Sequence, residues 1–107
     1  MKFKINGREW EIIEASQEKL KEIEKDKNEQ GEYFGLTCYD TQKIYLWNTL
    51  TKEAKRQTLM HELMHCYIGV YCSFQDMSWT EDIICNLCAN AHDTIETITK
   101  AYFLRNN

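Results

Sequence analysis

The chain has 107 residues and a formal net charge of -4 at pH 7, and 43% of its residues are hydrophobic. This length predicts a single domain over residues 1–107, and the apolar content excludes an intrinsically disordered chain. The acidic balance argues against a nucleic-acid-binding surface, and no apolar run approaches the roughly 20 residues of a membrane span. We therefore expect neither nucleic acid nor membrane as a partner, and the oligomeric state stays open.

Cysteine usage and the first residues bear on the compartment. The cysteines number five, which is odd, and residues 1–7 lack the apolar stretch of a secretory signal peptide. A reducing compartment keeps such cysteines as thiols. We therefore expect a cytoplasmic protein.

The first half of the chain predicts two β-hairpins with a short helix between them. Alternating apolar residues flank Asn6-Gly7, which is a strong hairpin signal, and Ser16 can cap a following helix. Two later runs rich in β-branched and aromatic residues are joined by a polar turn. The expected elements are strands near residues 2–5 and 8–13, a helix from Ser16 to about Lys27, and strands at 36–39 and 43–47.

A long helix is predicted next, with Thr51 as its N-cap and Gly69 as its stop. No Pro or Gly interrupts residues 51–68, and apolar residues recur there at three- and four-residue intervals, as on the buried face of a helix. The residues of this apolar face are Leu59, Leu63, Tyr67 and Val70.

A second long helix is predicted after a loop, with Thr80 as its N-cap. Its apolar residues repeat at helical spacing and are Ile84, Leu87, Cys88, Ala91, Ile95, Ile98 and Tyr102. Strands first and two long helices last predict an α+β fold, with a small antiparallel or mixed sheet packed on both helices.

The sequence His61-Glu62-Leu63-Met64-His65 (HELMH) lies within the first long helix and is typical of zinc metallopeptidases. Residues four apart share one face of a helix, so His61 and His65 can both direct a ring nitrogen at one ion. Glu62 lies about 100° around the helix, where its carboxylate can take a proton from a water instead of binding the metal. Two histidines that merely share a face are the alternative, but buried polar groups of this kind need a partner such as a metal.

A catalytic zinc takes three protein ligands and leaves one position open, so a third ligand is required. The extended pattern HExxHxxGxxH is excluded, because Ile68 and Tyr71 stand where Gly and His would be needed. The acidic pair Glu81-Asp82 opens the next helix and can supply a carboxylate ligand. An acid at a helix start also complements the helix dipole, which is its more common role.

These features together resemble a family. The order of two hairpins, an HExxH helix and a helix opening with Thr80-Glu81-Asp82 is similar to that of the minimal gluzincins, the short metallopeptidase-like proteins of the ImmA/IrrE group, common in bacteriophages and mobile elements. The resemblance covers most of the chain, from Phe3 to about Ile98, and implies a zincin-like fold. A link to repressor cleavage is implied by the family alone.

The resemblance also implies which acid binds the metal. Members carry an acid, usually Glu, followed four residues later by Asn or Asp, and Asp82 with Asn86 matches this register. It implies Asp82 as third ligand and Asn86 as its neighbour, which can accept a hydrogen bond from a ligating imidazole. The chain departs from the family by having Asp at the ligand position, and because Asp is one methylene shorter, Glu81 stays open as the alternative.

We expect from these observations a zinc-dependent metallopeptidase acting on a peptide or protein substrate. Zinc polarises the scissile carbonyl and lowers the pKa of a water, and Glu62 is the general base that takes the proton of that water. By analogy with zincins, an extended substrate is expected to pair with an exposed strand of the second hairpin near residues 44–46. The sequence identifies neither the substrate nor the residue that stabilises the oxyanion.

Two non-catalytic readings remain open. Cys85 and Cys88 form a CxxC that could complete a structural His2Cys2 zinc site with His61 and His65. A degenerate peptidase fold could instead serve as a protein-interaction module. Neither reading gives Glu62 a function.

The remaining reactive side chains are expected to be structural. Cys66 follows His65 directly and Cys38 lies in a predicted strand, but nothing in the pattern pairs either thiol with a base, which favours packing over nucleophilic catalysis. His92 is expected on the surface, and Tyr67 in the core, although Tyr67 and Tyr71 are both candidates for stabilising a tetrahedral intermediate.

Overall fold

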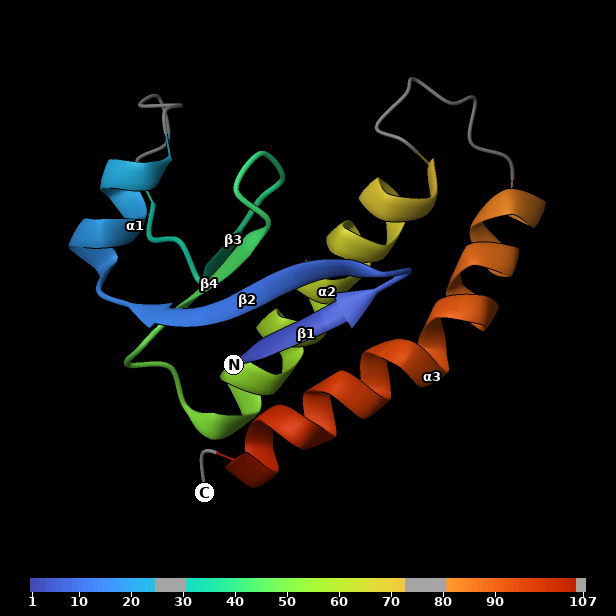
Figure 1. Ribbon diagram of the computed structural model, residues 1–107. Coiled ribbons are helices and arrows are strands. Elements are labelled where there is room, and N and C mark those ends of the chain that lie inside the picture. The colour runs from blue at the N-terminus through green and yellow to red at the C-terminus, as the bar shows by residue number, and fades with distance from the viewer. Residues whose placement is uncertain (25–30, 73–80, 106–107) are drawn as a thin grey trace.

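The computed structural model describes residues 1–24, 31–72 and 81–105, and of Cys72 and residues 81–86 it describes the backbone only. It confirms an α+β fold, with one four-stranded mixed sheet and three helices in the described part of the chain (Figure 1). The elements are β1 (Lys2–Ile5), β2 (Arg8–Ala15), α1 (Gln17–Ile23), β3 (Gly35–Cys38), β4 (Lys43–Trp47), α2 (Lys52–Cys72) and α3 (Glu81–Arg105).

The strand order is β1-β2-β4-β3. Both hairpins are antiparallel, as predicted, and β2 pairs with β4 in parallel. The first hairpin turns through Asn6 (φ 50°) and Gly7 (φ 78°), and positive φ at both positions is the requirement of a type I′ turn. The parallel pairing places β4 inside the sheet and β3 at its edge, so the expectation that residues 44–46 receive a substrate strand is wrong.

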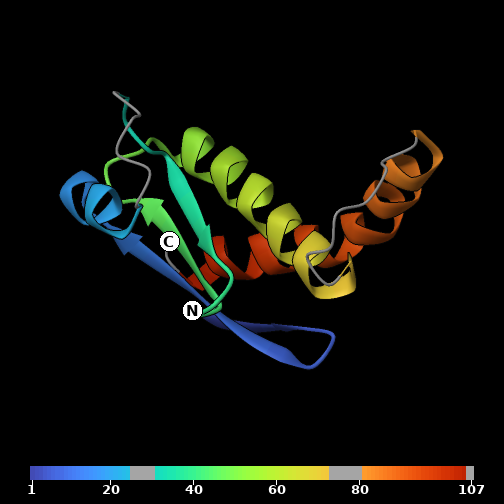
Figure 2. The ribbon, with the colours of Figure 1, turned by 90° about the horizontal axis from the view of Figure 1, so that it is seen from above.

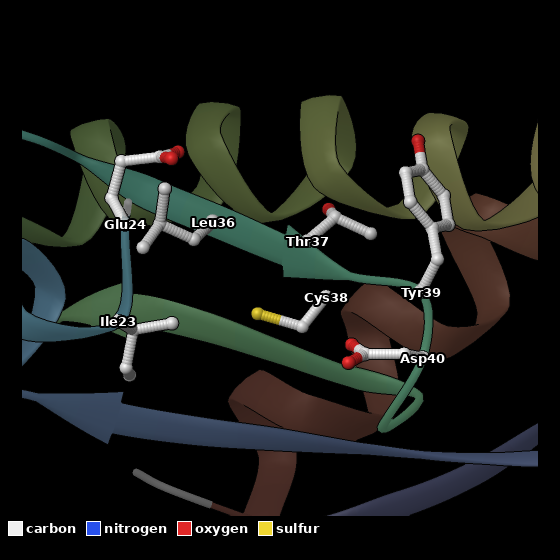
Figure 3. A pocket seen from close by; sticks show the side chains of 7 residues that line it. All are labelled: Ile23, Glu24, Leu36, Thr37, Cys38, Tyr39 and Asp40. Atoms are coloured by element: carbon white, nitrogen blue, oxygen red, sulfur yellow. The ribbon is translucent and has the colours of Figure 1, made fainter. Parts of the chain in front are cut away.

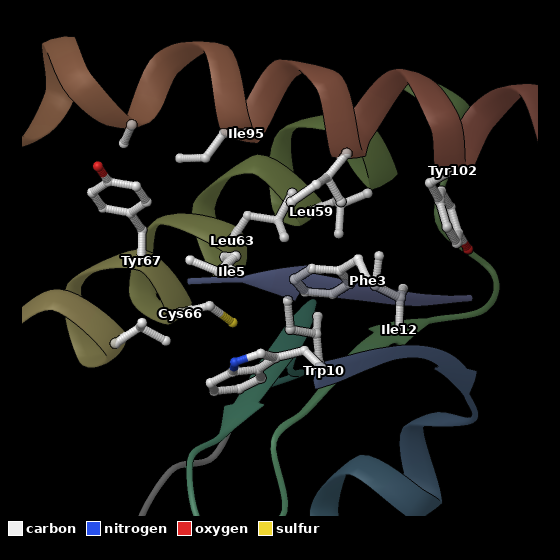
Figure 4. Close-up of a cluster of buried hydrophobic side chains, with 14 of the residues drawn as sticks. Phe3, Ile5, Trp10, Ile12, Leu59, Leu63, Cys66, Tyr67, Ile95 and Tyr102 are labelled. Carbon is white, nitrogen blue, oxygen red and sulfur yellow. The ribbon is translucent and has the colours of Figure 1, made fainter. Parts of the chain in front are cut away.

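Helices α2 and α3 enclose the core together with the sheet. Helix α2 contacts β1, β3 and β4, and α3 packs on α2 (Figures 1 and 4). Alternate residues of each strand point inward, as the period of two dictates. The core residues of the sheet are Phe3, Ile5, Trp10, Ile12, Ile44 and Leu46, and those of the helices are Leu59, Leu63, Cys66, Tyr67, Val70, Ala91, Ile95, Ile98 and Tyr102.

The predicted N-caps of the first two helices are confirmed. Ser16 accepts a hydrogen bond from the backbone N–H of Lys19 (3.2 Å), and Thr51 accepts one from Ala54 (3.2 Å). The predicted cap Thr80 lies outside the described residues. None of the helices in the described ranges is both long and apolar enough to cross a membrane.

Three expectations about the helices are wrong. Helix α1 ends at Ile23 and not near Lys27, because the backbone turns to an extended conformation at Glu24. Helix α2 runs through Gly69 to Cys72, since packing of Tyr67 and Val70 outweighs the roughly 1 kcal/mol that a helical Gly costs. Cys88 was expected on the apolar face of α3 but is exposed.

A polar cluster joins β2 to both long helices. The carboxylate of Glu14 forms an ion pair with Lys55 of α2, whose Nζ lies 2.8 Å from Oε1. Its other oxygen accepts a hydrogen bond from the hydroxyl of Tyr102 in α3. Partial burial alone would raise the pKa of Glu14, but these two donors together hold it below its usual value. The cluster thus links the C-terminal half of α3 directly to β2.

Candidate metal centre

The two histidines of HELMH converge in the middle of α2. Their Nε2 atoms lie 3.2 Å apart and their ring centroids 4.9 Å apart, and the rings meet at 74°. Both residues are exposed, with 69% of the His61 side chain open to solvent. The two histidines share one helix face, as the i, i+4 spacing predicts, but this face lies at the protein surface. The expectation that burial of the imidazoles requires a metal partner is therefore wrong, and of the three polar residues only Glu62 is buried.

The spacing of these nitrogens fits one zinc ion. Two nitrogens bound tetrahedrally at about 2.0–2.1 Å from zinc are about 3.3 Å apart by geometry. The observed 3.2 Å is within about 0.1 Å of the separation that two zinc-bound nitrogens require. The same distance also suits a hydrogen bond between one protonated and one unprotonated Nε2, so it fits a metal without requiring one.

The Glu62 carboxylate lies beside this pair but is buried. Only 8% of the residue is exposed, and its Oε1 accepts a 2.7 Å hydrogen bond from the hydroxyl of Thr37. Its Oε2 lies 4.0 Å from Nε2 of His61. One carboxylate oxygen is thus held by the edge strand, and the other lies near the nitrogen donors.

Glu62 can be buried because strand β3 runs very close to α2 (Figure 2). A Cβ built on Gly35 would lie 2.8 Å from Cγ2 of Thr58, 3.0 Å from the carbonyl oxygen of Tyr45 and 3.2 Å from Cγ of Glu62. Only glycine fits at this approach without a shift of its neighbours. The absence of a side chain at position 35 therefore helps to set where the carboxylate lies.

A surface depression of about 310 Å³ opens at the same place. It lies where the beginning of β3 meets α2, and of the two histidines His61 lines it. Its lining residues are Phe34, Gly35, Gln57, Thr58, His61 and Glu62.

A larger cavity of about 420 Å³ lies between the end of α1 and strand β3 (Figure 3). It contains the half-buried thiol of Cys38. Burial raises the pKa of this thiol, and the carboxylates of Asp40, Glu24 and Glu62 raise it further. A thiol of this kind stays protonated at neutral pH, which agrees with a packing role for Cys38.

The third ligand is not located by the structure. The side chains of Glu81, Asp82, Cys85 and Asn86 lie outside the described residues, although the backbone of all four belongs to the first turns of α3. Among the side chains that are described, no group of three or more His, Cys, Asp or Glu could hold a metal ion. The choice between Asp82 and Glu81, and the position of Asn86, stay predictions.

The other candidate residues take structural places. Cys66 is fully buried, and burial raises the pKa of its thiol well above its usual range, with Glu62 adding to the effect. Tyr67 is in the core, as expected, whereas Tyr71 is 49% exposed. His92 is exposed on α3 next to Asp93 (3.4 Å), which agrees with its predicted surface position.

Sequence reasoning missed Gly35 and Thr37. Residues two apart share one face of a strand, so the sequence shows that these two lie together. Nothing in the sequence shows that this face meets Glu62, because the contact depends on how β3 packs against α2.

The chain matches no known protein-family model, no curated protein and no solved structure. Its function is therefore argued from the chemistry of these residues and their geometry.

The close approach of β3 to α2 predicts that Gly35→Ala destabilises the protein by about 1–3 kcal/mol, as expected for overpacking. Chemical denaturation monitored by circular dichroism measures the change in the free energy of unfolding. Gly31→Ala is the matched control, because a Cβ at Gly31 would meet nothing within 4 Å. Equal stability of the two variants would contradict the close packing described here.

Proposed function

We propose that this protein is a zinc-dependent metallopeptidase of the gluzincin type, similar to the ImmA/IrrE group, with a zincin-like fold and a peptide or protein as substrate. One observation supports the proposal above the others. The 3.2 Å pair of Nε2 atoms lies next to a buried carboxylate whose Oε2 is 4.0 Å from one of them. Two nitrogen donors and an adjacent base are what metal-assisted hydrolysis requires.

His61 and His65 would hold the zinc ion, and a carboxylate from the start of α3 would complete the set, with Asp82 preferred and Glu81 as the alternative. Zinc, when bound, supplies a Lewis acid that polarises a carbonyl and lowers the pKa of a water to about 7. The imidazoles must be neutral to bind, so metal binding weakens in acid.

Glu62 is the general base in this proposal. Its Oε2 takes a proton from the attacking water, and the same carboxyl group later gives that proton to the leaving amine. The near-complete burial of Glu62 keeps bulk water away from the carboxylate, which strengthens its electrostatic interaction with nearby donors.

The substrate strand is assigned to β3 and not to β4. Within the described residues β3 pairs with β4 alone, so its outer edge can add an extended peptide by backbone hydrogen bonds. This edge lies along α2 beside the depression at His61 and Glu62. A bound peptide would therefore pass the histidine pair.

The two alternatives account for less of the geometry. A structural His2Cys2 site would need both Cys85 and Cys88, and it would leave the carboxylate of Glu62 buried beside the metal without a function. A protein-interaction module would need no convergent nitrogen pair. The tests below separate these readings.

We expect one zinc ion per chain, and we expect His61→Ala or His65→Ala to lower zinc affinity by more than about 100-fold, since even residues that only support a ligand are worth 10–100-fold. Zinc content after purification without chelator, with competition titration for affinity, measures this. His92→Ala is the matched control and should bind zinc as the wild type does. Protein that carries no zinc would refute the metal site.

Glu62→Gln tests the reaction directly. The amide cannot accept the proton, so hydrolysis should fall by about 10²–10⁴-fold or more while zinc content and fold are retained. Cleavage of a peptide library, read by mass spectrometry with wild type and variant side by side, is the measurement. A wild type that cuts nothing, or a variant that cuts equally well, would remove Glu62 as the base.

The third ligand is tested by Asp82→Ala and Glu81→Ala. The family register and the shared helix face of residues 82 and 86 predict that zinc affinity falls much further for Asp82→Ala. A larger loss with Glu81→Ala would mean that the register is displaced by one residue. Loss of zinc in Cys85→Ser or Cys88→Ser would establish the structural site instead.

A further inference from the structure

Thr37 is the nearest polar contact of the Glu62 carboxylate in the described structure. Its hydroxyl lies 2.7 Å from Oε1 of Glu62 and 3.3 Å from the backbone carbonyl oxygen of the same residue. A hydroxyl has one proton to donate. The shorter distance and the negative charge of the acceptor both favour donation to the carboxylate.

This hydrogen bond makes the two oxygens of Glu62 unequal. Oε1 is held by Thr37, while Oε2 is the oxygen 4.0 Å from Nε2 of His61. A glutamate side chain has three rotatable bonds, and one hydrogen bond at its end restricts all three. The contact therefore fixes the orientation of the carboxylate, with its second oxygen on the side of His61.

Gly35 acts on the same side chain from the same face of β3. It leaves room for Cγ of Glu62, which would lie only 3.2 Å from a Cβ at position 35. Strand β3 thus leaves room for Cγ of Glu62 at Gly35 and holds its Oε1 at Thr37. A contact that only joined β3 to α2 would not need to end on the carboxylate.

We propose that Thr37 is a positioning residue that holds Oε1 of Glu62, so that Oε2 is the oxygen that accepts the proton of the attacking water. This inference rests on the proposed peptidase function. The hydroxyl of Thr37 touches neither metal nor substrate in it and acts through Glu62 alone, whereas the backbone of β3 is the part of the strand that would pair with a substrate. Displacement of a catalytic group by about 1 Å can cost 100-fold in rate, which sets the scale of the expected effect.

The test compares Thr37→Val with Thr37→Ser. Valine keeps the shape of threonine and removes the donor, whereas serine keeps the donor and removes the methyl group. We expect Thr37→Val to lower kcat about 10- to 100-fold with KM and zinc affinity unchanged, and Thr37→Ser to stay within about threefold of the wild type. Thr97→Val, at an exposed position of α3, is the control for the substitution itself.

A second readout does not depend on activity. In protein labelled with ¹³C at the glutamate carboxyl carbons, the resonance lost in Glu62→Gln identifies Glu62. We expect this resonance to shift in Thr37→Val and to remain in place in Thr37→Ser.

The outcomes separate this inference from the proposed function. Equal kcat in the wild type and Thr37→Val, or equal loss in Thr37→Val and Thr37→Ser, would overturn the positioning role while the peptidase stands. A wild type that cuts no peptide would overturn the peptidase and, with it, the catalytic purpose of Thr37. The carboxyl resonance would then still decide whether Thr37 holds the Glu62 carboxylate, and an unmoved resonance would overturn that as well.

Discussion

The burial of the Glu62 carboxylate beneath the edge strand is the constraint on which the rest of the site depends. An unpartnered polar group costs roughly 2–7 kcal/mol to bury, and an isolated charge costs more. Thr37 offsets this cost with a hydrogen bond, and Gly35 allows the backbone of β3 to come close enough for that bond to form. The strand and the helix must therefore hold one specific distance.

The rotation of α2 follows from the same constraint. The helix buries Glu62 together with Leu59 and Leu63, and this orientation leaves His61 and His65 in solvent, one turn apart. The histidines are thus placed by the packing of their neighbours on the helix and need no contacts of their own. The same orientation of α2 that buries its apolar face therefore also places the two histidine Nε2 atoms at the surface.

Local signals in the sequence were enough to predict the type and order of the elements, but not where α1 and α2 end. The Asn6-Gly7 turn, the Thr51 cap and the HELMH spacing each act over a few residues, and all three agree with the structure. The order of the strands could not be predicted, because the parallel pairing of β2 with β4 joins segments that are distant in the chain. The contact of Thr37 with Glu62 escaped prediction for the same reason. At Gly69 a local signal gave a wrong prediction: glycine was expected to end the helix, but α2 continues to Cys72 because the residues around Gly69 are packed in the core.

The central claim is that the HELMH pair forms part of an open, catalytic zinc site. X-ray absorption at the zinc edge of the zinc-loaded protein tests it most directly, because sulfur and nitrogen or oxygen ligands lie at different distances from the metal. The account predicts imidazole scattering from two histidines, with all ligands at about 2.0–2.2 Å. A sulfur shell at about 2.3 Å, from Cys85 and Cys88, would contradict it and establish a closed structural site.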